Sequence, residues 1–274
     1  MKELVEEWLA LHHGYTRQSY ENTINQFGSA VKLPLARIKS QHVRNWLDSL
    51  DCADTTKQKH LAILKAFFNY VVTLDGAPIK SSPLPRQFKV AVPKETLVER
   101  ILTVEEVKAL IENEKDRRNH LILKTLYQTG VRVSELCGLS WKDITPRPEI
   151  KTVQLTVYGK RGKTRYITLK PELAIELEKF RESALGTAPI FTSEKGNALA
   201  PAHIHRIVKR AAGKAQLPQA EKVSPHWLRH AHATHALERG APLRLVQATL
   251  GHASLDTTSK YLHIRPSESS GDYL

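Results

Sequence analysis

The sequence predicts a mainly helical fold with one small β-hairpin, divided into a helical first part and a second part that holds the hairpin. Apolar residues recur at helical spacing through most of the 274 residues. Two adjacent runs near residues 152–169 instead alternate and are rich in β-branched residues, as the strands of a hairpin are. Prolines between residues 80 and 100 interrupt all periodicity, which indicates a boundary between the two parts. The length suits one large domain or two modest ones.

The first 75 residues are predicted to form a small helical bundle. Helices are expected from Thr16, from Ser40 and over residues 55–72, with Thr16 and Ser40 as N-terminal caps. Each helix carries an apolar stripe, and aromatic residues at this spacing indicate core packing rather than a cofactor site. The stripes consist of Tyr20, Ile24, Phe27, Val43, Trp46, Leu47, Leu50, Leu61, Leu64, Phe68 and Val71.

A proline-rich segment is expected to separate the two parts. Residues 80–100 read KSSPLPRQFKVAVPKETLVER, where no helical or strand pattern survives. Thr103 and Glu106 then form a T-x-x-E capping box, which predicts that a helix begins there. We therefore expect a first domain over residues 1–92, a linker over 93–100 and a second domain over 101–274.

The second part is predicted to be helical around one hairpin. Its strands are expected over residues 152–157 (TVQLTV) and 164–169 (TRYITL), joined by the basic tip YGKRGK with Gly159 and Gly162 in a tight turn. The later segments PELAIELEKF, AHIHRIVKRAAGKA and PHWLRHAHATHALERG read as helices, the last of them ending at Gly240. PLRLVQATLG and SLDTTSKYL are expected to be two short final helices.

The net charge indicates a polyanionic partner. The chain has 41 Lys and Arg against 28 Asp and Glu, a formal charge of +13, and a pI near 9.7. Residues 1–93 carry +4 and residues 94–274 carry +9, so the excess is not confined to a tail. Nucleic acid is the commonest partner of such a chain, and the alternative is a solvated basic surface with no partner.

Other features exclude several classes of protein. The two cysteines, Cys52 and Cys137, exclude a disulfide scaffold and a cysteine-built metal site. The opening MKELVEEWLAL lacks the basic start of a secretory signal, and no run approaches the roughly 20 apolar residues of a membrane helix. We expect a cytoplasmic, nucleoid-associated protein with no membrane contact.

Several polar residues are candidates for chemistry on a phosphate. Arg132 follows Gly130 at a helix boundary, where it can grip phosphate oxygens or pair with Glu135. His226 and Arg229 share one helix face, and an imidazole beside a guanidinium suits phosphoryl transfer. The alternative for this pair is a histidine at a helix start followed by an exposed arginine.

The remaining candidates are also ambiguous when taken singly. His226, His230, His232 and His235 raise the question of a metal, but HAHATH lacks the glutamate of a zinc-protease motif and has no nearby cysteine or carboxylate cluster. We therefore expect no metal and no cofactor. Tyr261, near the end of the chain, is either a packing residue or a nucleophile that forms a phosphotyrosine.

Taken together, these residues resemble the tyrosine recombinase (phage-integrase) family. The motifs stand in the family's order as RVSEL, YGKRGK, HWLRH, LGH and TTSKYLH. The helical first part also resembles the family's core-binding domain, so the resemblance covers nearly the whole chain. The layout is most similar to that of the small integrases and the Xer-type recombinases. It implies a two-domain architecture, with residues 1–92 binding DNA and residues 101–274 carrying catalysis.

The resemblance implies a role for each matched residue in metal-independent strand cleavage and rejoining. Arg132 and Arg229 would hold the non-bridging phosphate oxygens, and Tyr261 would attack the phosphorus. Lys160 would protonate the departing 5′-hydroxyl, with Lys163 as the competing hairpin candidate. His226 would move the tyrosine proton, and His252 would hydrogen-bond the phosphate. The expected supporting residues are Glu135 and Asp143 around Arg132, and His230 beside Arg229.

The same resemblance implies the DNA contacts and the assembly. Lys57, Lys59, Arg161 and Lys163 are expected to contact the DNA backbone, so affinity should fall with salt. The substrate would be a double-stranded recombination site, with a dimer on one site and a tetramer in the synapse. An accessory protein or a partner recombinase is possible.

Two alternatives remain at this stage. The same residues would serve a type IB topoisomerase, which nicks and recloses DNA without exchanging partners. The fold would also serve a catalytically silent DNA-binding protein, although all six catalytic positions hold competent residues. His232 departs from the family, in which an aromatic or aliphatic residue is usual.

Overall fold

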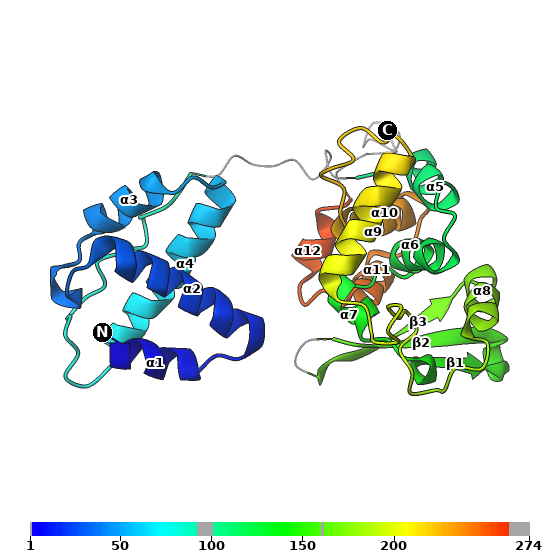
Figure 1. The fold of residues 1–274 in the computed structure, drawn as a ribbon, viewed down its shortest axis with the longest axis horizontal. Coiled ribbons are helices and arrows are strands. Elements are labelled where there is room, and N and C mark those ends of the chain that lie inside the picture. The colour runs from blue at the N-terminus through cyan, green and yellow to red at the C-terminus, as the bar shows by residue number, and fades with distance from the viewer. Residues whose placement is uncertain (1, 92–100, 160–161, 263–274) are drawn as a thin grey trace, which may run out of the picture. The chain divides into compact units, whose positions relative to one another are not determined.

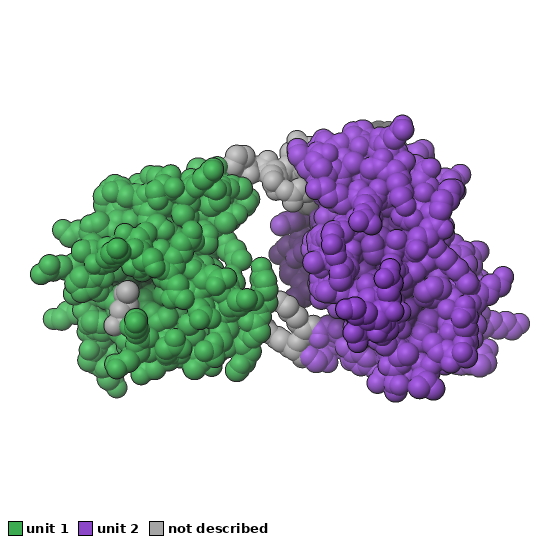
Figure 2. All heavy atoms as spheres, in the orientation of Figure 1, with its two compact units in different colours: residues 1–94 green, residues 95–274 purple. Residues whose placement is uncertain are grey.

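The computed structural model describes residues 2–91, 101–159 and 162–262, and it confirms the mainly helical fold with a small antiparallel sheet (Figure 1). The chain divides into two compact units, Met1–Lys94 and Glu95–Leu274, whose atoms are coloured separately in Figure 2. No helix among the described residues is both long enough and apolar enough to span a bilayer.

The first unit is a helical bundle with its own core. It consists of α1 (Lys2–Ala10), α2 (Gly14–Val31), the 3₁₀ turn η1 (Leu35–Arg37), α3 (Ser40–Ser49) and α4 (Asp54–Val72). Helix α2 packs against the other three α-helices. Aromatic rings fill the centre, where Trp8 stacks on Tyr20 with ring centroids 4.8 Å apart and Phe68 is fully buried. The predicted stripes therefore do pack in a core.

The second unit is built around α10. Its α-helices are α5 (Val104–Glu112), α6 (Arg117–Thr129), α7 (Val133–Cys137), α8 (Pro171–Arg181), α9 (Pro201–Lys214), α10 (Pro225–Glu238), α11 (Leu243–Leu250) and α12 (Leu255–Ser259). Helix α10 packs against α5, α6, α9 and α11. The predicted capping box is present, since Thr103 Oγ1 accepts from the Glu106 N–H at 3.1 Å and Glu106 Oε2 accepts from the Thr103 N–H at 2.8 Å.

A three-stranded antiparallel sheet lies beside these helices, in the order β1-β2-β3 (Figure 1). The strands are β1 (Ile144–Arg147), β2 (Thr152–Tyr158) and β3 (Thr164–Leu169), with the short 3₁₀ turns η3 (Trp141–Asp143) and η4 (Pro148–Ile150) on either side of β1. The hairpin was predicted, whereas β1 was missed because its sequence ITPR is short and contains a proline.

The register of the sheet brings a charged residue into its apolar face. Leu155 pairs with Ile167 and Val157 pairs with Arg165, and paired residues of antiparallel strands point to the same face. Leu155, Val157 and Ile167 are buried. Arg165 therefore continues an inward-facing row, beside β3's contacts with α6 and α11.

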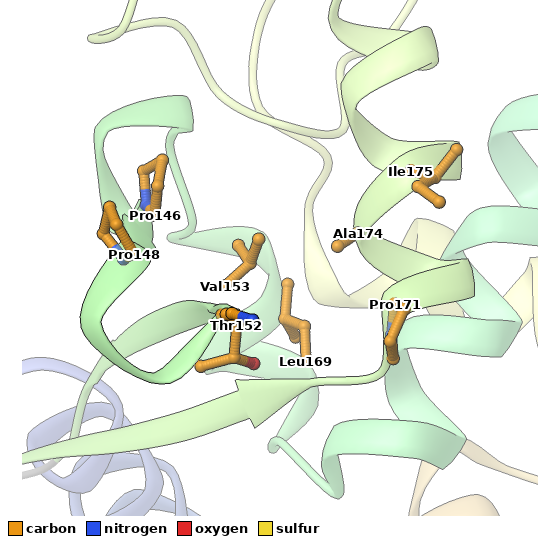
Figure 3. A pocket seen from close by; sticks show the side chains of 9 residues that line it. Pro146, Pro148, Thr152, Val153, Leu169, Pro171, Ala174 and Ile175 are labelled. Atoms are coloured by element: carbon orange, nitrogen blue, oxygen red, sulfur yellow. The ribbon is translucent and has the colours of Figure 1, made fainter.

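At the other end of the sheet lies an apolar pocket of about 320 Å³ (Figure 3). Pro146 and Pro148 line one side, and Ala174 and Ile175 of α8 line the other. None of the candidate catalytic residues lines this pocket.

Candidate active site

The described candidate catalytic residues all lie in the second unit. Four of them, Arg132, Arg229, His252 and Tyr261, meet around the C-terminal end of α11. Arg132 stands at the start of α7, and His226 and Arg229 lie on α10. His252 follows α11, and Tyr261 follows α12. Lys160 and Arg161 lie outside the described residues, so their predicted roles stay predictions.

Arg229 is buried at the junction of three helices. Its Nη1 donates to the carbonyl of Gly130, the residue that ends α6, and its Nη2 donates to the carbonyl of Leu250, the last residue of α11, at 2.7 Å. Only 5% of the residue is exposed. Burial, and then repulsion from Arg132, lowers the pKa of Arg229 to about 10, so the side chain is cationic at neutral pH. One guanidinium thus joins two helix ends and keeps its positive charge.

Glu135 holds two further arginines, Arg132 and Arg165. Its Oε1 accepts from Arg132 Nη1 and Arg165 Nη1, both at 2.9 Å, and its Oε2 accepts from Arg165 Nη2 at 2.8 Å and from the Arg132 N–H at 2.7 Å. Burial alone raises the pKa of this carboxyl, but the hydrogen bonds from Arg165 and Arg132 lower it to about 2. The carboxylate is therefore ionised and holds Arg132, whose side chain is 37% exposed.

Sequence reasoning missed Arg165, which links the hairpin to the site. Besides Glu135, its Nε donates to the carbonyl of Thr249 at 2.7 Å, and its side chain lies beside Gly251. The sequence contains a signal for this position, because Arg165, Ile167 and Leu169 occupy every second position of β3 and therefore share one face of the strand. A charged residue in such a row predicts a buried ion pair.

The expectation that Asp143 supports Arg132 is wrong. Asp143 is buried, and its Oδ2 accepts from the N–H and the hydroxyl of Ser140, both at 2.8 Å. These bonds cap the turn η3 before β1. Asp143 therefore stabilises the entry to the sheet, and Glu135 alone of the two carboxylates contacts Arg132.

His232 has a structural role that accounts for its departure from the family pattern. Its Nδ1 donates to the carbonyl of Tyr127 at 2.8 Å, and its ring lies against Gly130. Burial lowers the pKa of His232 to about 4, so the ring is neutral. A Cβ on Gly130 would lie 2.7 Å from the ring and 2.8 Å from a methyl carbon of Leu250, so α6 and α10 can approach this closely only at a glycine.

Tyr261 is 6% exposed and packs with Ala233, Val246 and Leu250. Its hydroxyl lies 2.7 Å from His230 Nδ1, a hydrogen bond between α10 and the end of α12. Burial raises the pKa of the Tyr261 phenol, which therefore carries its proton at neutral pH. The family resemblance implies that His226 moves the phenolic proton, and we expected only a supporting role for His230. Among the described residues, the hydroxyl has no hydrogen bond to His226.

The two other candidate histidines flank this pair. The His252 ring is stacked on Tyr261, with centroids 6.4 Å apart, and its Nδ1 is 2.9 Å from the Thr258 hydroxyl. Burial, then repulsion from Arg229 and Arg132, lowers the pKa of His252 to about 4. His226 lies 6.4 Å from His230 by ring centroids, and burial and Arg229 lower its pKa as well.

The residues predicted to contact DNA are divided between the units. Lys57 and Lys59 lie near the start of α4 in the first unit, where the Lys59 ammonium stands 5.6 Å from the centroid of the Tyr15 ring. Lys163 is exposed beside the hairpin tip, and its carbonyl accepts from the Gly159 N–H at 2.7 Å. The part of the chain that the structure describes contains no group of three or more His, Cys, Asp or Glu side chains that could hold a metal ion.

Comparison with known proteins shows the family of this chain. Residues 100–268 match the model of the phage integrase family. The chain is 37% identical to the tyrosine recombinase XerD of Brucella suis, over 86% of this chain and 81% of that protein. It is 31% identical to the tyrosine recombinase XerC of Pelobacter propionicus, over 91% of this chain and 85% of that protein.

Solved structures with the same fold include recombinases bound to DNA. The XerH recombinase bound to its difH substrate before cleavage matches with a TM-score of 0.71 and 25% identity, over 91% of this chain and 76% of that one. A lambda integrase dimer on a core site matches with a TM-score of 0.79 and 20% identity, over 98% of this chain and 97% of that one. At that identity the second match shows the fold alone.

Proposed function

The chain belongs to the phage integrase family and is a tyrosine recombinase of the Xer type, and on this premise we propose that it recombines a specific DNA site through a 3′-phosphotyrosine formed at Tyr261. Its activity is the cleavage and rejoining of DNA. The observation that supports our residue assignment is the convergence at one helix end. The carbonyls of Leu250 and Gly251 accept from Arg229 and Arg132, and His252 follows directly, stacked on Tyr261.

In the proposed reaction, the Tyr261 oxygen forms a bond to the scissile phosphorus and the bond from phosphorus to the 5′-oxygen breaks. Negative charge builds on the non-bridging oxygens, which Arg132 and Arg229 stabilise because both cations are fixed before DNA arrives. Lys160 donates a proton to the departing 5′-oxygen. Rejoining reverses these steps with a 5′-hydroxyl from another strand, so the bond energy is kept and no cofactor is consumed.

His252 is proposed to donate a hydrogen bond to a phosphate oxygen. A pKa of about 4 keeps the ring neutral at physiological pH. When the Thr258 hydroxyl donates to Nδ1, the ring carries its proton on Nε2, and that N–H can donate to the phosphate. Thr258 is fully buried and thereby fixes the ring's orientation. His226 remains a candidate for moving the tyrosine proton.

We assign the two parts of the chain different tasks. Residues 1–92 bind DNA through Lys57 and Lys59, and residues 93–100 form the linker between the two domains. Residues 101–274 carry catalysis, and their Arg161 and Lys163 contact the DNA backbone. Lambda integrase, which shares the fold, is known as a dimer on a core site and as a tetramer on a Holliday junction. By analogy, we propose a dimer on one site and a tetramer in the synapse. An accessory protein or a partner recombinase is a further proposed partner. We place the reaction in the cytoplasm, at the nucleoid.

A covalent-capture experiment tests this function. The full-length protein and the Tyr261→Phe variant are incubated with nicked, fragmented genomic DNA from the source organism, because a nick near the cleavage point traps the intermediate. DNA that stays attached to protein in SDS is recovered and sequenced. We expect wild-type adducts on one recurrent sequence and none with Tyr261→Phe, which still binds that sequence.

Two results would contradict the proposal. Adducts spread without sequence preference would indicate a topoisomerase-like enzyme. Sequence-specific binding that is equal for both proteins, with no adduct on any fragment, would indicate a silent DNA-binding protein.

A further inference from the structure

The nucleophile's hydroxyl is already held by a histidine that the motif-based assignment treats only as support. Tyr261 Oη and His230 Nδ1 are 2.7 Å apart, and the two rings have centroids 5.6 Å apart. The phenol is nearly inaccessible to water, with 6% of the residue exposed. A proton that leaves this oxygen therefore has a nearby protein acceptor and little access to solvent.

The reaction requires such an acceptor. A neutral phenol is a weak nucleophile, and burial keeps Tyr261 protonated by raising its pKa. Lys160 is assigned to the departing oxygen on the opposite side of the phosphorus, so it does not serve the attacking oxygen. General bases are effective when they lie within about 2.6–3.2 Å of the proton-bearing atom, which His230 does.

The position of His230 is fixed by its neighbour in the sequence. Arg229 attaches α10 to the ends of α6 and α11 through the carbonyls of Gly130 and Leu250. His230 is the next residue on the same helix turn, and Tyr261 packs on Leu250 and Ala233. The same packing of α10 against α6 and α11 therefore fixes the positions of both Arg229, which stabilises the phosphate, and His230, which contacts Tyr261.

We propose that His230 is a catalytic residue whose Nδ1 accepts the phenolic proton as Tyr261 attacks the phosphorus. The O–H bond of Tyr261 breaks and its electron pair forms the bond to phosphorus, while the bond from phosphorus to the 5′-oxygen breaks and Lys160 protonates that oxygen. One proton is gained by His230 and one is lost by Lys160. In rejoining, His230 returns its proton to the Tyr261 oxygen. This inference rests on the proposed function.

His226 is the competing acceptor and supplies the matched control. It lies one turn before His230 on α10, with ring centroids 6.4 Å apart, and it has no hydrogen bond to Tyr261 within the described part of the chain. His230→Asn and His226→Asn make the same chemical change on the same helix face. Asparagine places an amide near the position of Nδ1 but cannot take up a proton.

The test measures single-turnover cleavage of a nicked suicide duplex that carries the captured site, with enzyme in excess. We expect His230→Asn to slow adduct formation by about 100-fold or more, the usual contribution of a general base, with unchanged DNA affinity. Replacing Tyr261 by 3-fluorotyrosine, whose phenol is more acidic, should then recover much of the lost rate in His230→Asn. A variant that had only lost packing would gain nothing from a more acidic phenol.

A sulfur-substituted substrate distinguishes the two ends of the reaction. A 5′-bridging phosphorothiolate has a leaving group that needs no protonation, so it should rescue Lys160→Ala and leave His230→Asn slow. If His230→Asn does not fold, His230→Gln is measured in the same way.

Each outcome bears on a distinct claim. Recovery by fluorotyrosine in His226→Asn but not in the His230 variant overturns this inference and assigns the proton to His226. Wild-type rates in the His230 variant overturn it as well. Absence of any adduct with wild-type protein contradicts the proposed function itself, which separates that failure from the failure of His230.

Discussion

At the residue scale, the two arginines that we propose to be catalytic differ in their structural contacts. Arg229 donates hydrogen bonds to two backbone carbonyls. The Arg132 side chain is 37% exposed and pairs with Glu135, which would still have Arg165 as a partner if Arg132 were removed. Both are proposed to contact the phosphate. The same chemical deletion at the two positions should therefore have the same catalytic result and different structural results.

We predict that Arg229→Ala lowers the free energy of unfolding by about 3 kcal/mol, because the carbonyls of Gly130 and Leu250 lose their donor. Arg132→Ala should lower it by about 1 kcal/mol or less. Both variants should fail to form the covalent adduct. Urea denaturation compares the stabilities, and equal losses at the two positions would show that the carbonyl contacts do not stabilise the unit.

A second prediction concerns the pH dependence of stability through His232. Its folded-state pKa of about 4 lies below the ordinary value of 6.5, so the unfolded chain binds the proton more readily. The contribution of the neutral ring to the free energy of unfolding is complete above pH 6.5. It falls by up to about 3 kcal/mol as the pH is lowered towards 4.

The matched variant is His232→Asn, which keeps a donor for the Tyr127 carbonyl but does not titrate. Denaturation at several pH values should give a wild-type curve that falls more steeply between pH 6.5 and 4 than the curve of the variant. Parallel curves would mean that His232 is protonated in the folded protein without cost.

At the element scale, the close approach of α6, α10 and α11 depends on Gly130. Its φ is +62°, and an added Cβ would meet the His232 ring and Leu250. Gly240, after α10, has a φ of +81°, but an added Cβ there would have nothing within 4 Å. Substitutions at the two glycines therefore distinguish the stability cost of backbone strain from the cost of packing.

We predict that Gly240→Ala costs about 1 kcal/mol of stability, the usual strain of a left-handed alanine. Gly130→Ala should cost about 3 kcal/mol or more, because overpacking adds to the same strain. It should also slow adduct formation, since the Gly130 carbonyl positions Arg229. Denaturant titration measures both variants. Equal destabilisation would show that His232 and Leu250 move away from the added Cβ at little energetic cost.

Most of the elements could be predicted from the sequence because their patterns are local. The Thr103 cap, the aromatic stripe of α4 and the alternation of β2 and β3 each follow from residues a few positions apart. β1 was missed, because its residues bear no strand pattern and pair only in the presence of β2.

The candidate site was predictable in its members and not in its contacts. The ordered motifs identify Arg132, Arg229 and Tyr261, but the hydroxyl's partner depends on how α10 and α12 pack across 31 residues of sequence. Two histidines on one helix face are equivalent in the sequence, and the structure separates them. Arg165 is different, since its inward position is already visible in the strand pattern.

At the scale of the whole molecule, each unit has a core of its own. Buried residues of the first unit, among them Trp8, Phe27, Trp46 and Phe68, all come from residues 1–94 and cluster with one another. The cluster that includes Leu123, Leu155 and Leu228 belongs wholly to the second unit. Independent cores are the requirement for independent folding.

We therefore predict that residues 1–94 fold when they are expressed alone. The fragment should show helical circular dichroism and one cooperative thermal transition. Phe68→Ala in the fragment should remove about 3–5 kcal/mol of stability or unfold it, since Phe68 is fully buried. A fragment without a cooperative transition would show that its core needs the rest of the chain.

The double attachment of Arg229 constrains how this gene can decay. A copy released from selection for recombination can exchange Tyr261 for phenylalanine at the loss of one hydrogen bond, and it keeps its shape. Loss of Arg229 instead removes the donor of two carbonyls and endangers the fold that DNA binding requires. Descendants that only bind DNA should therefore lose Tyr261 early and retain the buried Arg229 long after recombination activity is gone.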